Sequence, residues 1–334
     1  MSARPSVLVA RVVFDDVVER LRLHFDVEAN PSDMPWSRSE LIARLKGKRG
    51  ALISGSERID AEVLAANPQL RVVSNIAVGY NNIDLAACNA RGVLVTNTPD
   101  VLTETTADFG FALMMATARR MAEAERFLRR GEWKKWSLTL LGGADVHGAT
   151  LGILGMGRIG QAIARRGALG FGMKVIYHNR SRLQTEVESS LNACYVSKTE
   201  LLQRADHLVL VLPYSAESHH AIGEAELALM KPTATLTNVA RGGIVDDEAL
   251  ARALASGRIA AAGLDVFEGE PQLNPALLAV PNVVLTPHIA SATIATRRAM
   301  ANLAVDNLIA GLGFGKDAGR PPTPVNPEVL PLQP

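Results

Sequence analysis

The chain has 334 residues, of which 48% are hydrophobic and 21% charged, and its formal net charge at pH 7 is +1. This length favours two domains with packed cores, and the near-zero charge argues against a general electrostatic surface for nucleic acids or membranes. Two cysteines are too few for a disulfide framework. No signal-peptide pattern opens the chain and no apolar run reaches membrane-spanning length, so we expect a cytoplasmic protein.

The first hundred residues alternate short apolar strands with amphipathic helices. We expect strands at residues 6–13, 25–28, 50–54, 71–75 and 92–96, and helices at 17–23, 39–45 and 60–66. Such alternation is typical of parallel βαβ units. Residues 1–98 therefore form one α/β domain in this interpretation, and it contains no glycine-rich dinucleotide motif.

A long helical stretch at residues 103–130 could then link two domains. Strand and helix signals alternate again beyond it. We expect strands at residues 150–154, 174–177, 208–212, 233–239, 259–264 and 282–285, and helices at 161–169 and 246–256. A last long helix at 291–312 has no following strand, so we expect it to cross back to the first domain. The Pro-rich residues 316–334 are expected to form a loosely attached tail.

The most informative stretch is Gly155-Met156-Gly157-Arg158-Ile159-Gly160, which lies between a predicted strand and a predicted helix. Strand, glycine turn, helix and second strand within about 30 residues is the context that a dinucleotide-binding motif requires. Gly155 allows the tight turn, Gly157 lets a pyrophosphate approach the backbone, and Gly160 lets the helix pack on the strand. The helix N-terminus then faces the phosphates. The alternative is a glycine-rich turn without a ligand.

The end of the next strand indicates which dinucleotide is bound. An NAD site usually has Asp or Glu there, about 20 residues on, to bind the ribose 2′-hydroxyl. This chain has Asn179, 19 residues past Gly160, followed by Arg180-Ser181-Arg182. Two guanidiniums and a hydroxyl could bind a 2′-phosphate, and no carboxylate repels one. The segment predicts a preference for NADP(H), with NAD(H) as the second candidate; solvated surface arginines are the alternative.

Three side chains of catalytic type follow predicted strands of the second half. Arg241 follows Asn238-Val239-Ala240, Glu270 follows the segment 263–269, and His288 follows Thr286-Pro287. Ligands of open α/β sheets bind at the carboxyl ends of the strands. We therefore expect these three side chains to converge beside a nicotinamide, although each taken singly would be read as an ion pair or a structural histidine.

These motifs carry a resemblance that extends over nearly the whole chain. The sequence resembles the D-isomer-specific 2-hydroxyacid dehydrogenases in the glycine turn and in three further motifs: Asn238-Val239-Ala240-Arg241-Gly242-Gly243, Gly263-Leu264-Asp265-Val266-Phe267-Glu268 and Pro287-His288-Ile289. It looks closest to the glyoxylate/hydroxypyruvate reductases, including the 2-ketogluconate (2-ketoaldonate) reductases. The shared segments there are Ala77-Val78-Gly79-Tyr80-Asn81, Val101-Leu102-Thr103-Glu104-Thr105, Gly131-Glu132-Trp133 and His178-Asn179-Arg180-Ser181-Arg182.

The resemblance implies an α/β fold of two Rossmann-like or flavodoxin-like doubly wound parallel-sheet domains with a cleft between them. Residues 1–98 plus 289–334 would form the substrate-binding (catalytic) domain, and residues 99–288 the NAD(P)-binding domain. It also implies NADPH-dependent reduction of a small 2-oxoacid (glyoxylate, hydroxypyruvate or 2-ketogluconate) to a D-2-hydroxyacid, and usually a homodimer. No nucleic acid or membrane is expected as a partner.

The chemistry gives each catalytic side chain a role. His288 would donate a proton to the carbonyl oxygen, since imidazole titrates near operating pH. Glu270 would hydrogen-bond the other ring nitrogen, and Arg241 would bind the substrate carboxylate and keto oxygen. The resemblance further implies that the Val78 and Gly79 amides hold the substrate carboxylate; an ordinary strand-to-helix turn is the alternative.

The other residues expected at the cofactor lie on both sides of the glycine turn. Thr106 would contact the nicotinamide-side phosphate, and Asp265 would either accept from the carboxamide, as the resemblance implies, or cap a helix. The full set of expected cofactor contacts is Thr106, Gly155, Gly157, Arg158, Ile159, Gly160, Asn179, Arg180, Ser181, Arg182, Leu212, Pro213, Val239, Ala240, Arg241, Asp265 and His288.

Two aromatic residues and a histidine pair are less decisive. Core packing is the default interpretation of Trp133 and Trp136. In related reductases their arm belongs to the dimer interface, so Trp136 reaching the partner's substrate pocket is an alternative hypothesis. His219 and His220 are adjacent rather than at i, i+4 spacing, with no Cys or His pattern nearby, so no metal site is expected.

Other functions keep the same motifs. Phosphoglycerate, formate and phosphite dehydrogenases belong to the same superfamily, and a dinucleotide-sensing corepressor would keep the fold and the three side chains while acting through protein contacts. Oxidation of NADPH on addition of glyoxylate or hydroxypyruvate separates an enzyme from a sensor.

Overall fold

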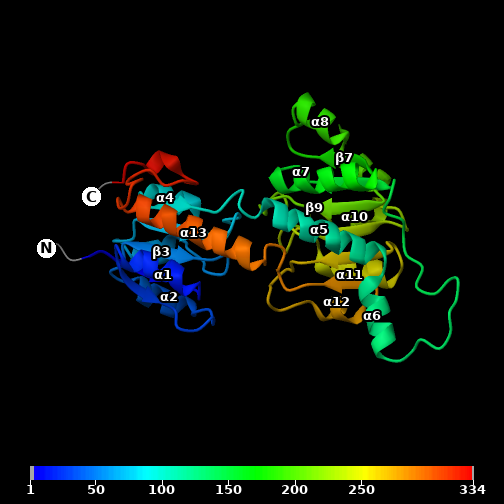
Figure 1. Ribbon diagram of the computed structural model, residues 1–334, viewed down its shortest axis with the longest axis horizontal. Coiled ribbons are helices and arrows are strands. Elements are labelled where there is room, and N and C mark those ends of the chain that lie inside the picture. The colour runs from blue at the N-terminus through cyan, green and yellow to red at the C-terminus, as the bar shows by residue number, and fades with distance from the viewer. Residues whose placement is uncertain (1–3, 333–334) are drawn as a thin grey trace. The chain divides into compact units, whose positions relative to one another are not determined.

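A computed structural model describes residues 4 to 332 of the chain. Contacts between Cα atoms divide the chain into two compact units. Unit 1 is Met1–Leu102 together with Thr293–Pro334, and unit 2 is Thr103–Ala292 (Figure 1).

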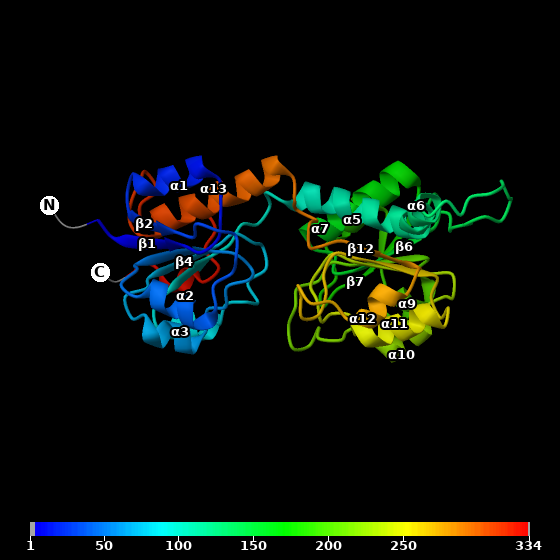
Figure 2. The ribbon, with the colours of Figure 1, turned by 90° about the horizontal axis from the view of Figure 1, so that it is seen from below.

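Unit 1 contains a five-stranded parallel sheet in the order β2-β1-β3-β4-β5. Its strands are β1 (Ser6–Val9), β2 (Asp26–Ala29), β3 (Gly50–Ile53), β4 (Val72–Asn75) and β5 (Leu94–Thr96). Its helices are α1 (Asp15–Arg22), α2 (Arg38–Leu45), α3 (Ala61–Ala66), α4 (Leu85–Ala90) and α13 (Ile294–Gly311), with a 3-10 turn at Pro327–Val329. Helices α1 and α13 cover one face of the sheet and α2 and α3 the other (Figure 2). The strand order is the flavodoxin-like one.

Unit 2 contains a seven-stranded parallel sheet in the order β12-β11-β10-β9-β6-β7-β8. Its strands are β6 (Thr150–Leu154), β7 (Lys174–His178), β8 (Ala193–Tyr195), β9 (His207–Leu210), β10 (Thr235–Asn238), β11 (Ala261–Leu264) and β12 (Val283–Leu285). Its helices are α5 (Thr103–Ala118), α6 (Met121–Arg129), α7 (Arg158–Arg165), α8 (Thr185–Leu191), α9 (Lys198–Arg204), α10 (Glu224–Leu229), α11 (Asp247–Ala255) and α12 (Pro275–Ala279), with a π-helical turn at Arg166–Gly170. This is the dinucleotide-binding strand order, so the predicted class of two doubly wound parallel-sheet domains is confirmed.

The strands read as short apolar runs because both faces of each sheet are covered. Every residue of β3, β4, β9 and β10 is buried. Helices α5 and α7 enclose one core of unit 2, and α9 to α12 enclose the other on the opposite face (Figure 2). Continuous burial on both faces is what distinguishes such strands from the alternating strands of an exposed antiparallel sheet.

The predicted single helix at 103–130 is wrong in one respect. Arg120 has a φ of +53° and breaks the stretch into α5 and α6. Gly143 packs against that break, because a Cβ there would lie 2.3 Å from the Ala118 carbonyl oxygen. The chain between α6 and β6 then runs as a long loop, which is visible beyond α6 in Figure 1.

The expectation of a loose tail at 316–334 is also wrong for its described part. The Asn326 side chain is fully buried and accepts a hydrogen bond from the Val95 amide at 2.7 Å. Val325 donates its amide to the Val95 carbonyl at 2.8 Å. Proline-rich sequence here reflects an extended segment that packs along β5, not a segment without contacts.

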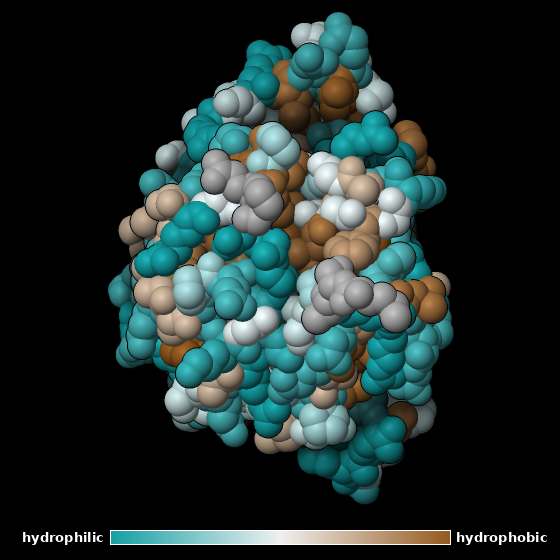
Figure 3. All heavy atoms as spheres, turned by 90° about the vertical axis from the view of Figure 1, so that its left-hand side faces the viewer, coloured by the Kyte–Doolittle hydropathy of each residue, from teal (hydrophilic) through white to brown (hydrophobic). Residues whose placement is uncertain are grey.

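Hydrophilic side chains cover most of the face of unit 1 seen in Figure 3, and apolar ones occur there in small groups. Among the helices of residues 4 to 332, none combines the length and apolar character that crossing a membrane requires.

Candidate active site

The glycine turn of unit 2 joins β6 to α7 at the point where the strand order reverses between β6 and β9. Gly155 has a φ of +102°, and a Cβ there would lie 2.6 Å from the Leu212 amide nitrogen. A Cβ on Gly160 would lie 2.4 Å from the Gly155 carbonyl oxygen. At the exposed N-cap Gly157, by contrast, a Cβ would meet no heavy atom within 4 Å. The turn therefore presents an open helix N-terminus, which suits a pyrophosphate.

Helix α5 brings a second polar group to this region of unit 2. The Thr106 hydroxyl is buried and has no hydrogen-bond partner within residues 4 to 332. A buried hydroxyl without a partner costs free energy, so a bound polar group would stabilise it. A Cβ on Gly110, one turn later, would lie 3.2 Å from Ile163 of α7 and 3.3 Å from Val239 after β10, so α5 packs closely against both elements. These residues fit a dinucleotide whose pyrophosphate lies at α7.

Of the other predicted contacts, Arg158 and Ile159 open α7, with Arg158 exposed and Ile159 half-buried. Leu212 is half-buried and Pro213 exposed in the loop after β9. The Leu212 backbone would be the closest neighbour of any side chain placed at Gly155, so this loop packs directly against the glycine turn.

Asn179, directly after β7, forms hydrogen bonds with two neighbouring segments of unit 2. Its side-chain oxygen accepts the Met156 amide at 2.6 Å, and its carbonyl oxygen accepts the Tyr195 hydroxyl at 3.1 Å. Asn179 thus joins the end of β7 to the glycine turn, a role that sequence reasoning missed.

The two arginines that follow Asn179 differ from one another. Arg182 donates to both carboxylate oxygens of Glu188, at 2.9 and 2.7 Å, and Glu188 also accepts the Tyr177 hydroxyl at 2.6 Å. Arg180 and Ser181 are exposed. The pairing of Arg182 was not predictable, because Glu188 lies six residues further along the chain with no motif to mark it.

The three predicted catalytic side chains come together at the carboxyl edge of the sheet in unit 2. His288 Nδ1 and Glu270 Oε1 are 2.6 Å apart, and the second Glu270 oxygen accepts the Phe267 amide at 3.2 Å. Arg241 follows β10, is half-buried, and donates to the Ala240 carbonyl at 2.6 Å. Val239 and Ala240, which precede it in the chain, are buried.

Burial and charge act on these groups in opposite directions. Burial lowers the pKa of the Arg241 guanidinium, and the Glu270 charge opposes that change. An arginine nevertheless stays protonated in proteins. Burial alone would raise the pKa of Glu270, yet the hydrogen bond and charge of His288 outweigh it and hold that pKa below its ordinary value. The arrangement favours the anionic form of the Glu270 carboxylate beside the imidazole.

Asp265, which follows β11 directly, holds the segment that carries His288. Its carboxylate accepts the Thr286 hydroxyl and the amides of Ile289 and Ala290, each at 2.8 Å. Burial raises the pKa of Asp265 against the effect of these bonds, and the side chain is 1% exposed. Asp265 therefore has a positioning role within the protein, which neither of the two sequence interpretations included.

Val78 and Gly79 belong to unit 1 and follow β4. Their carbonyl oxygens accept bonds from the side-chain amides of Asn97 and Asn75, at 2.8 and 2.9 Å. The Ala77 carbonyl accepts the Thr98 amide at 2.9 Å. Three consecutive carbonyls are thus fixed inside unit 1, which sets the orientation of the intervening peptide planes.

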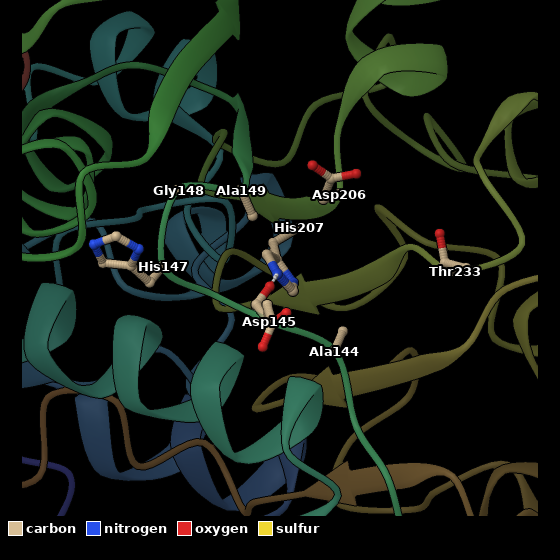
Figure 4. Close-up of a pocket in the computed structure, with 8 residues that line it drawn as sticks. All are labelled: Ala144, Asp145, His147, Gly148, Ala149, Asp206, His207 and Thr233. Atoms are coloured by element: carbon tan, nitrogen blue, oxygen red, sulfur yellow. Dashed lines mark hydrogen bonds between the residues drawn. The ribbon is translucent and has the colours of Figure 1, made fainter.

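A hollow of about 350 Å³ lies at the opposite edge of the unit 2 sheet and contains none of the predicted site residues (Figure 4). His207 is fully buried beside it and bonds to Thr235 and to the Asp145 carbonyl. Asp206 pairs with Lys231 at 2.7 Å. These contacts join the amino ends of neighbouring strands. The polar residues that line this hollow therefore have a structural role.

Comparison with known proteins agrees with this geometry. Residues 111–290 match the family described as D-isomer specific 2-hydroxyacid dehydrogenase, NAD binding domain. A glyoxylate reductase of Thermococcus onnurineus is 50% identical over 98% of this chain and 97% of its own. The NADPH-dependent glyoxylate/hydroxypyruvate reductase of Sinorhizobium meliloti, solved with NADP and malonate, is 38% identical with a TM-score of 0.85, covering 97% of both chains. A D-mandelate dehydrogenase of Rhodotorula graminis is 28% identical with a TM-score of 0.85, covering 96% of this chain and 97% of its own.

Proposed function

The chain belongs to the D-isomer specific 2-hydroxyacid dehydrogenases, a family of NAD(P)-dependent oxidoreductases, as its motifs predicted, and on that premise we propose that it reduces glyoxylate with NADPH. The proposal extends to hydroxypyruvate and 2-ketogluconate as larger 2-oxoacids. The observation that carries it is the 2.6 Å bond between His288 and Glu270, beside Arg241 at the carboxyl edge of the sheet that holds the glycine turn.

The catalytic residues act on the 2-oxoacid in complementary ways. NADPH, when bound, supplies the hydride for the keto carbon. Arg241 presents two parallel donors to the carboxylate and the keto oxygen, which orients the substrate and polarises its carbonyl. Glu270 holds Nδ1 of His288, so Nε2 delivers the proton to the oxygen as charge develops there. Asp265 keeps the His288 segment in place.

The adenosine end of NADPH binds at the turn after β7. Arg180 and Ser181 are exposed and can bind the 2′-phosphate, while Arg182 is held by Glu188 and orders the loop. Asn179 occupies the place of the carboxylate that would favour NADH, and its side chain braces the glycine turn. The absence of a carboxylate at this position supports a preference for NADP(H).

Unit 2 is the NAD(P)-binding domain in this proposal, and unit 1, built from both ends of the chain, is the substrate-binding domain. The amides of Val78 and Gly79 hold the substrate carboxylate. The protein is a homodimer whose interface includes the arm that contains Trp133 and Trp136. These side chains are 55% and 73% exposed, so they are not core residues within the chain. A cytoplasmic location stays a prediction from the sequence.

A substrate panel with both cofactors tests the proposal. Oxidation of NADPH on addition of glyoxylate or hydroxypyruvate is expected, with a lower KM for NADPH than for NADH. Phosphoglycerate, formate and phosphite are included with NAD in the oxidising direction. NADPH binding without turnover on the whole panel would contradict the enzymatic role and favour a sensor of the dinucleotide.

A further inference from the structure

Three side chains of types that can ligate a metal ion lie together in unit 2, apart from the proposed catalytic side chains. His219, His220 and Glu268 each offer a ligand atom, and these three atoms lie within 4.8 Å of one another. Glu268 is 48 residues beyond His220 in the chain, yet its Oε2 is 2.9 Å from His220 Nε2. The sequence argument against a metal site rested on the lack of a nearby ligand, and the fold supplies one. We propose that these residues bind a divalent transition ion of the Zn²⁺ type.

The backbone conformation at this site brings two neighbouring imidazoles together. His220 has a φ of +49°, which is uncommon for a residue with a side chain. With that conformation the rings of His219 and His220 stack, at 3.9 Å between centroids and 24° between planes. Successive side chains on a strand would point to opposite faces instead. The conformation is fixed by the His220 amide, which donates to the Gly243 carbonyl at 2.7 Å.

Neighbouring groups orient the ligands as outer contacts of a metal site do. The Tyr214 hydroxyl lies 3.2 Å from His219 Nδ1, which leaves Nε2 for an ion. The Glu268 amide donates to the buried Asp247 carboxylate at 3.1 Å, which fixes the backbone of the third ligand and adds a nearby negative charge. The ligand side chains remain solvent-accessible, with 37% of His220 and 46% of Glu268 exposed, so an ion can enter.

The ligand set indicates the type of ion. Two imidazoles and one carboxylate suit Zn²⁺, Ni²⁺ or Cu²⁺ better than Mg²⁺ or Ca²⁺, which prefer oxygen ligands. Metal–ligand bonds of about 2.0–2.2 Å would require shifts of the exposed side chains by about an ångström or less, within their rotamer freedom. Three protein ligands leave one tetrahedral position for water.

The ion would connect two loops that border the catalytic side chains. His219 and His220 belong to the loop after β9, and this loop passes beside the glycine turn at Leu212. Glu268 precedes Glu270, the carboxylate that holds His288, by two residues. A Cβ on Gly242 would lie 1.8 Å from the Phe267 carbonyl oxygen, so the loop after β10 is packed directly against the same segment.

Titration of the full-length protein with ZnCl2 by calorimetry, and with CoCl2 by visible absorption, tests the site. One Zn²⁺ per chain is expected, and a tetrahedral Co²⁺ spectrum. The substitutions His219→Gln, His220→Gln and Glu268→Gln should each weaken Zn²⁺ binding at least about tenfold. His147→Gln, an exposed histidine at the other edge of the sheet, is the matched control and should change the affinity less than about twofold.

A competing site must be distinguished, because His288 and Glu270 could also bind an ion. His288→Gln should leave Zn²⁺ binding unchanged. No binding at about 100 micromolar Zn²⁺, binding that survives all three ligand substitutions, or loss of binding only in His288→Gln would each overturn the proposal. Thermal unfolding of every variant without metal shows whether it is folded. These outcomes are independent of reductase activity.

Discussion

The substitution Arg180→Gln tests which arginine binds the 2′-phosphate under the proposed preference for NADPH. Arg180 and Arg182 are two residues apart, but Arg182 is already bound by Glu188 through two bonds of 2.9 and 2.7 Å. Arg180 is exposed and lies near enough to Glu217 for its charge to lower the pKa of that carboxyl, after the larger effect of a Ser215 hydrogen bond. We therefore expect the 2′-phosphate to bind at Arg180.

The expected loss follows from one guanidinium–phosphate contact. A charge-assisted hydrogen bond contributes about 1.5–3 kcal/mol. At about 1.36 kcal/mol for each tenfold change, removing it raises the KM for NADPH roughly 10- to 150-fold. The Glu217 carboxylate lies within electrostatic range of Arg180, and the site is open to solvent, so we expect the lower half of that range. The KM for NADH should change less than about twofold, since its 2′-hydroxyl carries no charge.

The assay is initial-rate reduction of glyoxylate at varied NADPH and NADH, at two ionic strengths. The matched control is Arg182→Gln, which leaves Glu188 without its guanidinium partner. It should lower the melting temperature while changing the ratio of the two KM values less than about threefold. An equal increase in both KM values for Arg180→Gln, or a larger selectivity loss for Arg182→Gln, would refute the reasoning.

Four further outcomes are expected. His288→Gln should lower kcat by about 10²–10⁴-fold while the NADPH Kd, measured by fluorescence, stays within about threefold; near-normal turnover would remove the proton-donor role. Asp265→Asn should lower the unfolding free energy by about 2–3 kcal/mol in urea titrations, because three donors lose an anionic acceptor, and an unchanged value would contradict this. For Asp206, burial raises the pKa, but Lys231 and the Thr150 amide outweigh it and the pKa is lowered. This stabilisation is present above the unfolded-state pKa of about 3.9 and is lost as pH falls through the folded value, so the Tm difference between the wild type and Asp206→Asn should shrink below about pH 4. Trp136→Ala should weaken the dimer or raise the KM for the 2-oxoacid; light scattering and kinetics that both match the wild type would exclude this role.

Local patterns determined most of the secondary structure. Buried parallel strands are short apolar runs between turn residues, so all but the short strand β8 could be located from composition, although their ends shifted by a few residues. The glycine turn could be predicted because the backbone there requires glycine, for example at Gly155 with its φ of +102°. The three side chains of the proposed catalytic site could be singled out because they follow strand ends, and the fold brings His288 and Glu270 within 2.6 Å of each other.

Patterns failed where a distant segment decides the local conformation. Nothing in the composition of residues 103–130 marks a helix break at Arg120; Gly143, further along the chain, packs against this break. Pro-rich sequence suggested a loose tail, but Asn326 is buried because β5 offers it an amide donor. In both cases a partner far along the chain outweighs local propensity.

The sequence by itself therefore determined the fold class, the glycine turn and the set of side chains proposed for catalysis. Only the tertiary structure decided which polar groups form hydrogen bonds with one another. Glu188 pairs with Arg182, Asp265 accepts bonds from the segment that carries His288, and Glu268 lies beside His220. The physical reason is that backbone conformation and apolar periodicity depend on residues that are close together in the sequence. A hydrogen bond between side chains depends on a distance of about 3 Å between atoms that the fold alone brings together.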